Sequence, residues 1–106
     1  MNYRYMRTIL FFDLPVLTPF QRKAYRKFVK NIKRLGFYML QESVYVKMSI
    51  DQQKSRSTIN LINSIVPDDG NVIAITVTEK QFNSMDILLG KNTTDVVTSD
   101  ERIIEL

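Results

Sequence analysis

The stretch from Thr18 to Gly36 reads TPFQRKAYRKFVKNIKRLG, and it carries the strongest local structural signals in this chain of 106 residues. Thr18 is a favoured helix N-cap, Pro19 suits the first helical position, and Gln21 completes a capping box with Thr18. Gly36 is typical of the position just after a helix. Together these signals predict a helix from Thr18 to Leu35.

This predicted helix has two chemically distinct faces at helical spacing. The apolar face is expected to pack on the core and consists of Phe20, Ala24, Tyr25, Phe28, Ile32 and Leu35. The other face carries only cations, namely Arg22, Lys23, Arg26, Lys27, Lys30, Lys33 and Arg34. No acidic residue occurs from Leu14 to Gln41, so these like charges repel one another. Phosphates would relieve the repulsion, so the face indicates polyanion binding, and a plainly solvated face is the alternative.

A strand is predicted before the helix, from Met6 to Asp13. Its residues Ile9 to Phe12 are continuously apolar, which indicates a strand buried on both faces in the middle of a sheet. Pro15 lacks a backbone N–H and ends the strand.

Two further strands are predicted within the stretch from Phe37 to Met48, because Val44, Val46 and Met48 alternate with more polar residues. Gln41-Glu42-Ser43 marks either a tight turn or a bulge between them. A β-branched strand is predicted from Val72 to Thr78, after a turn at Pro67-Asp68-Asp69-Gly70.

A second helix is predicted from Asp51, as N-cap, to Ile65 or Val66. Its core-facing residues are expected to be Ile59, Ile62 and Val66, with Leu61 as a further candidate.

The predicted order is strand, helix, two strands, helix, strand, which is the α+β ferredoxin-like βαββαβ arrangement. Its two crossovers place both helices on one face of an antiparallel sheet. The other face is then uncovered, and we expect it to form a homodimer.

The C-terminal part does not fit this simple fold. Residues 1–82 are predicted to form the ferredoxin-like domain and residues 83–106 a C-terminal extension at the dimer interface. Asp86–Leu89 and Arg102–Leu106 are short strand-like segments that could add to a sheet edge in either chain. A frayed terminus is the alternative for the last segment.

The composition limits the chemistry. The formal net charge is +4 and the pI is near 9.5, which favours polyanionic partners. The absence of Cys and His excludes disulfides, thiolate metal sites and histidine base catalysis. The chain shows no apolar run long enough to span a membrane and no signal peptide, so a cytoplasmic location and no membrane partner are expected.

Asp13 is the candidate catalytic and metal-binding residue, because it ends the central strand just before the basic helix. A turn-forming role before Leu-Pro is the alternative. One carboxylate holds Mg²⁺ poorly, but two copies of Asp13 across a dimer axis could share one ion, which would activate water on a phosphodiester. Ser43 is a candidate for contacting phosphate or supporting Asp13, and satisfying a turn or bulge is its alternative role.

Two arginines near the start of the chain could extend the phosphate-binding surface. Arg4 and Arg7, with Tyr3 and Tyr5 beside them, could contact phosphates or stack on bases. Packing at a sheet edge is an equal alternative. The predicted nucleic-acid-binding set is therefore Arg4, Arg7, Arg22, Lys23, Arg26, Lys30, Lys33 and Arg34.

With these residues placed, the chain resembles the second core CRISPR-associated (Cas) protein family, the small partner of the spacer-integrating enzyme. The matching features are the strand ending in Phe12-Asp13-Leu14, the basic helix before Gly36, Gln41-Glu42-Ser43-Val44-Tyr45, and Val72 to Thr78 followed by Lys80-Gln81-Phe82. The resemblance covers about Met6 to Leu89.

The resemblance implies a ferredoxin-like homodimer that bridges pairs of integrase subunits and holds spacer DNA along its basic surface. It also implies metal-dependent cleavage of RNA or duplex DNA in some members, with the aspartate at the position of Asp13 as ligand. Several relatives have further carboxylates soon after that aspartate, whereas Leu14-Pro15-Val16-Leu17 supplies none here.

Three functions fit the sequence, and it favours the first, with the second as the alternative. The first is a dimeric scaffold for CRISPR adaptation that binds double-stranded DNA, with single-stranded RNA as an alternative ligand. The second is a Mg²⁺-dependent endonuclease or endoribonuclease built on Asp13 and its symmetry copy. The third is a ferredoxin-like regulatory domain, because this fold supports many functions.

Overall fold

A computed structural model of the chain describes residues 5–90. Its elements follow the predicted order and are β1 (Met6–Asp13), α1 (Pro19–Arg34), β2 (Tyr38–Gln41), β3 (Val44–Ser49), α2 (Gln52–Asn63), β4 (Asn71–Thr78) and α3 (Glu79–Asn83). Short α3 spans the predicted boundary between residues 82 and 83.

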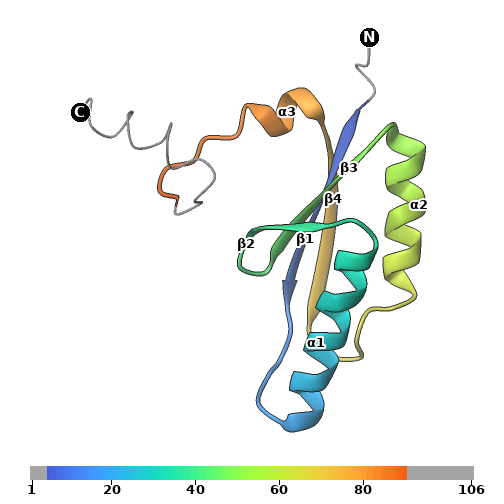
Figure 1. Cartoon of the computed structure of the whole chain (residues 1–106), viewed down its shortest axis with the longest axis vertical. Coiled ribbons are helices and arrows are strands. Elements are labelled where there is room, and N and C mark those ends of the chain that lie inside the picture. Colours follow the sequence, from blue (N-terminus) through green and yellow to red (C-terminus); the bar gives the residue numbers. More distant parts are fainter. Residues whose placement is uncertain (1–4, 91–106) are drawn as a thin grey trace.

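The four strands form one antiparallel sheet in the order β2-β3-β1-β4, which is the ferredoxin-like topology. Helices α1 and α2 lie on the same face of this sheet, and α3 follows the end of β4 (Figure 1). The predicted fold class is therefore confirmed.

The core lies between the sheet and the two long helices. Alternate side chains of β1 point into it, and Phe12 packs edge-on against Phe28 of α1, with ring centroids 5.3 Å apart, and stacks on Tyr45 of β3. Leu10 and Ile32 are fully buried in this core. Burial raises the pKa of the Tyr45 hydroxyl above its ordinary value.

The ends of α1 confirm the predicted signals. The backbone N–H of Gln21 donates to the Thr18 hydroxyl at 3.1 Å, and the backbone N–H of Thr18 donates to the Gln21 side chain at 3.0 Å. Gly36 has φ +107°, the left-handed conformation that ends a helix. One expected core residue is wrong, because Phe20 in the first turn is 78% exposed.

Helix α2 differs more from its prediction. Its N-cap is Asp51, as expected, but the helix ends at Asn63, before Ile65. Ile62 is buried, whereas Leu61 and Val66 are exposed, so these two core assignments are wrong. The remaining buried positions of α2 are Ser55 and Thr58, whose hydroxyls accept or donate hydrogen bonds inside the fold.

Three smaller expectations are settled by the same structure. The segment after Met39 contains both a turn and a bulge, because the β2–β3 register shifts there and Ser43 has φ +67°. Phe11 is 42% exposed, so β1 is not buried on both faces within one chain. Asp86–Leu89 is not a strand in the structure, and Arg102–Leu106 lies outside the described residues. Within residues 5–90, no helix combines the length and apolar character needed to cross a bilayer.

Candidate nucleic-acid interface

The cationic face of α1 is fully displayed to solvent. Because Phe28 and Ile32 pack on the sheet, the opposite side of the helix points away from it. All seven predicted cations are exposed there, namely Arg22, Lys23, Arg26, Lys27, Lys30, Lys33 and Arg34. We call this set the basic face.

Carboxylates do not neutralise the basic face. Among residues 5–90 the single salt bridge joins Arg7 to Glu79, and the first turn of α1 contains no acidic residue. Seven like charges on one helix face repel at close spacing, and the N-cap, the capping box and core packing offset that cost. A row of phosphates is the ligand whose charge and geometry match such a surface.

Arg22 differs from the rest of the basic face. Its Nη1 donates to the backbone carbonyls of Val16 and Leu17, at 3.1 and 2.9 Å. The guanidinium therefore holds the loop between β1 and α1, and its remaining donors stay available to a phosphate.

Asp13 lies at the end of β1 with its carboxylate exposed. Since Phe12 points into the core, Asp13 and Phe11 lie on the sheet face that the long helices do not cover. We call this the open face. The basic face and Asp13 therefore belong to different surfaces of one chain.

Asn71 is the neighbour of Asp13 that sequence reasoning missed. The register of β1 and β4 pairs Asp13 directly with Asn71, which is also exposed. Side chains of such a pair start from Cβ atoms about 5 Å apart. Only the register of β1 and β4 identifies Asn71. Phe11 pairs with Ile73 in these antiparallel strands, so Asp13, two residues further along β1, pairs with Asn71.

The loop before Asn71 packs directly on the backbone of Asp13. A Cβ atom added to Gly70 would lie 2.7 Å from the Asp13 carbonyl oxygen and 2.8 Å from a methyl group of Leu14. Gly70 also has φ +104°. Glycine thus allows this close approach and fixes the position of Asp13 beside β4.

The backbone of Ser43 is hydrogen-bonded to the residue before Asp13. Its left-handed conformation forms the turn between β2 and β3, and its carbonyl accepts from the backbone N–H of Phe12 at 3.1 Å. This geometry shows the turn role of Ser43, and a contact of its hydroxyl with phosphate stays a prediction.

Arg7 is engaged within the fold. It donates to both carboxylate oxygens of Glu79 and to the Tyr38 hydroxyl, and its guanidinium carbon lies 4.4 Å from the Phe82 ring centroid. The hydrogen bond with Glu79 raises the pKa of Arg7 and lowers the pKa of Glu79. We therefore leave Arg7 out of the proposed phosphate surface, while Arg4 lies outside the described residues.

A single chain does not present a complete metal site in its described part. Within residues 5–90, no three carboxylates come together, and the chain contains no His or Cys that could complete such a group. Asp13 and Asn71 supply one carboxylate and one amide oxygen, whereas Mg²⁺ is octahedral and is bound through one or two carboxylates with several waters. A shared ion would therefore need the partner's Asp13.

The open face itself is apolar. Its exposed side chains come from all four strands and include Phe11, Tyr38, Met48, Ile73 and Ile75. An exposed sheet face of this composition is typical of a protein interface.

Comparison with known proteins is consistent with these features. A family model described as "CRISPR associated protein Cas2" matches residues 6–85. The chain is 46% identical to the CRISPR-associated endoribonuclease Cas2 of Ligilactobacillus salivarius, over 95% of this chain and 100% of the relative. It is 42% identical to the protein of the same name from Treponema denticola, with the same shares covered. It is 43% identical to that of Streptococcus mutans, over 95% of this chain and 93% of the relative.

Proposed function

This chain belongs to the CRISPR-associated Cas2 family, and from that premise we propose that it binds nucleic-acid backbones through the basic face of α1 as a dimeric scaffold in CRISPR adaptation. The observation that carries the proposal is the unneutralised basic face. Its cations lie along one face of α1 without an apolar or acidic interruption, so they suit a phosphate backbone, and contacts of this kind read no base sequence. Double-stranded DNA is the proposed ligand, and integrase subunits are the proposed protein partners.

The dimer is part of this proposal. The apolar open face would be covered by a second copy, which would also bring the two Asp13 residues toward one another at its edge. The basic face of each chain stays on the outside of such a dimer, because α1 lies on the other side of the sheet. Two basic faces would then serve one continuous duplex.

The scaffold role is tested by measuring duplex affinity over a range of salt concentrations. Phosphate contacts make log K fall with log salt by about 0.9 for each phosphate neutralised. Replacing Arg26, Lys30 and Lys33 together with alanine should weaken binding and reduce the salt slope by about one unit for each phosphate that is no longer neutralised. These side chains are exposed, so the fold should persist.

The matched control removes the same charge from other helices, at the exposed positions Lys54, Arg56 and Lys80. If this triple alanine variant lost as much affinity as the α1 variant, net charge alone would explain binding and the basic face would have no special role.

A second candidate function is metal-dependent cleavage of RNA. The observations that favour it are the exposed Asp13 beside Asn71 and the name endoribonuclease that the relatives carry. Two Asp13 carboxylates of a dimer would hold the proposed Mg²⁺. When bound, this ion would act as a Lewis acid on a phosphodiester and its attacking water.

Purified protein should then cleave RNA with Mg²⁺ and not with EDTA, and Asp13→Asn should remove the cleavage. Asp86→Asn is the control, because Asp86 is an exposed carboxylate near α3. Titration calorimetry with Mg²⁺ gives a second readout, in which Asp13→Asn should lose binding while the dimer persists. Equal cleavage by wild type and Asp13→Asn would reveal a contaminating nuclease.

A further inference from the structure

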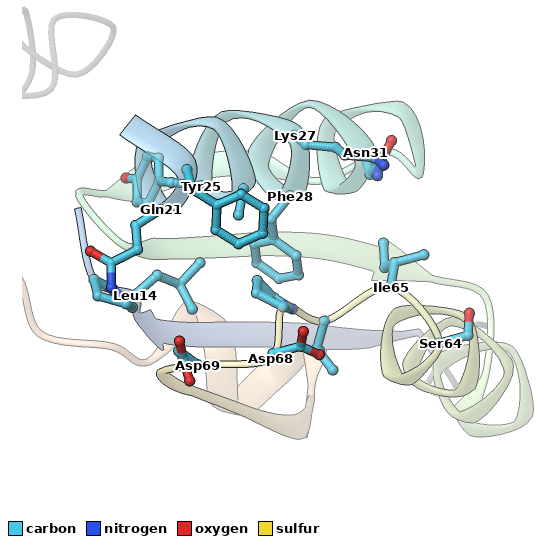
Figure 2. A pocket seen from close by; sticks show the side chains of 15 residues that line it. Leu14, Gln21, Tyr25, Lys27, Phe28, Asn31, Ser64, Ile65, Asp68 and Asp69 are labelled. Atoms are coloured by element: carbon cyan, nitrogen blue, oxygen red, sulfur yellow. The ribbon is translucent and has the colours of Figure 1, made fainter. Parts of the chain in front are cut away.

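A groove of about 370 Å³ lies between α1 and the segment that joins α2 to β4 (Figure 2). Its volume is near the lower end of the range for ligand pockets, about 300 to 1,000 Å³. Apolar side chains form most of its lining, among them Leu14, Tyr25, Phe28 and Ile65. It opens on the helix side of the sheet, so it is separate from the open face and from Asp13.

Two apolar residues that line this groove are predicted from the sequence to lie in the core, but the structure shows that both are exposed. Phe20 and Val66 fall on the core-facing sides of the two predicted helices, yet they are 78% and 37% exposed, and both line the groove. Leu17, in the loop just before α1, is 85% exposed. The single chain therefore leaves apolar surface exposed at this end of the helices. Burying that surface against a partner would be favourable by about 25 cal/mol per Å².

One side of the groove carries charge of the opposite sign to the net charge of the chain. Asp68 and Asp69 lie on the side of the groove across from α1 (Figure 2). Neither forms a salt bridge within residues 5–90, although the chain carries a net charge of +4. Lys27 of the basic face lines the groove on its α1 side, so the groove borders the proposed nucleic-acid surface, but the acidic side across from it repels phosphate and attracts a cation.

We propose that this groove binds a segment of a partner protein that inserts an aromatic or aliphatic side chain and pairs an adjacent lysine or arginine with Asp68 and Asp69. The apolar lining with exposed Phe20 takes the inserted side chain, and the acidic side selects the flanking charge. Nucleic acid carries no cation that could pair with Asp68 and Asp69. The inference goes beyond the proposed function, because it assigns a protein-docking site and the chemistry of its ligand to a groove that neither DNA binding nor cleavage requires.

To test the proposal, short random peptides displayed on phage are selected for binding to the whole wild-type chain. Peptides that also bind the Phe20→Glu variant are then removed. Phe20 is exposed, so this variant should fold. Selected peptides should combine a large apolar residue with a nearby lysine or arginine. The best peptide should bind Phe20→Glu about tenfold more weakly, as expected when one well-packed apolar side chain is removed from an interface.

A double-mutant cycle then tests the charge. The double variant that carries Asp68→Asn and Asp69→Asn removes both charges, and asparagine suits a turn as aspartate does. This variant should weaken the lysine-bearing peptide severalfold and leave its lysine-to-glutamine derivative unaffected. Leu61→Glu and Asp86→Asn are the controls, because both positions are exposed and neither lines the groove; they should bind the peptide as wild type does.

Several outcomes would overturn the proposal. Failure to select any Phe20-dependent peptide is one, and enrichment of acidic instead of basic peptides is another. Displacement of the peptide by a single-stranded oligonucleotide would assign the groove to nucleic acid. Self-association that Phe20→Glu abolishes would assign it to a second copy of the chain.

Discussion

Arg7 and Glu79 form a two-point ion pair that joins β1 to α3, with Nε 2.6 Å and Nη2 2.8 Å from the two carboxylate oxygens. The same guanidinium lies over the Phe82 ring and donates to the Tyr38 hydroxyl. Arg7 thus connects the central strand to a short helix and to the edge strand β2. Because α3 has no buried residue of its own, this pair is the main polar attachment of α3 to the sheet.

The Arg7–Glu79 pair predicts a specific pH dependence of stability. The hydrogen bond from Arg7 lowers the Glu79 pKa below its ordinary value of 4.5. A lowered folded-state pKa gives stability that is present above pH 4.5 and is lost as the pH falls through the folded-state value. Glu79→Gln should therefore cost about 1 kcal/mol at pH 7, since the pair is partly exposed, and less at pH 3.

Urea unfolding of both proteins at the two pH values measures this difference. Asp86→Asn, which removes an exposed carboxylate beyond α3, should unfold as wild type does at both. A cost for Glu79→Gln that is equal at pH 7 and pH 3 would show that packing, and not the ion pair, is what this residue contributes.

Gly70→Ala should destabilise the fold by about 2 kcal/mol or more. The new Cβ would meet the Asp13 carbonyl oxygen and Leu14, and alanine is strained at φ +104°. Gly36→Ala should cost less, because its Cβ would meet only the flexible end of Lys47, while φ +107° adds its own penalty. Thermal unfolding of the two variants compares them directly, and equal costs would mean that the contact with Asp13 is unimportant.

Most of the fold could be predicted because local signals and global topology agree. Thr18, Pro19, Gln21 and Gly36 specify the ends of α1 through their own hydrogen bonds and backbone preferences, which depend little on the rest of the chain. The βαββαβ order then leaves few topologies, because crossovers are right-handed.

The errors fall where tertiary structure overrides periodicity. Phe20 and Val66 have helical spacing for burial, but Phe20 lies in the first turn of α1 and Val66 lies just beyond the end of α2, and both stay exposed in the single chain. In the middle of α2 the opposite occurs, because Ser55 is buried against hydroxyls of the sheet. Apolar periodicity does not reveal a polar residue that is buried by such pairing.

The candidate site was only half predictable. Asp13 could be identified from its place at the end of an apolar strand, and the basic face from its spacing. Asn71 depends on which strand pairs with β1 and in which register, and that is a long-range property. For Arg7 the sequence leaves phosphate contact and packing at a sheet edge as equal alternatives, because its partner Glu79 lies 72 residues away in the sequence.

The hydroxyls of buried Thr8 and Ser55 and of half-buried Thr76 form a chain of hydrogen bonds, which predicts an unequal response to mutation. Ser55 is the central member, since it bonds Thr8 on one side and Thr76, at 2.8 Å, on the other. Ser55→Ala leaves the fully buried Thr8 hydroxyl unpartnered and should cost about 1–3 kcal/mol. Thr8→Val leaves the bond between Ser55 and Thr76 intact and should cost less.

Denaturant unfolding of these variants and of their combination provides the measurement. The double variant should be more stable than the sum of the single costs predicts, because it removes both partners of one hydrogen bond. Ser57→Ala, at an exposed position of α2, is the control and should be neutral or slightly stabilising. Additive costs would show that the three hydroxyls do not act as one unit.

Ile73→Lys should convert the proposed dimer into a folded monomer. Ile73 is 62% exposed on the open face opposite Phe11, so a single chain tolerates lysine there, whereas a dimer would have to bury its charge. Sedimentation velocity should show about half the mass at concentrations where wild type is dimeric, with an unchanged circular dichroism spectrum. Leu61→Lys, 55% exposed on α2, is the matched control and should stay dimeric. A dimer that survives Ile73→Lys and is lost in Leu61→Lys would move the interface to the helix side and would separate the two copies of Asp13.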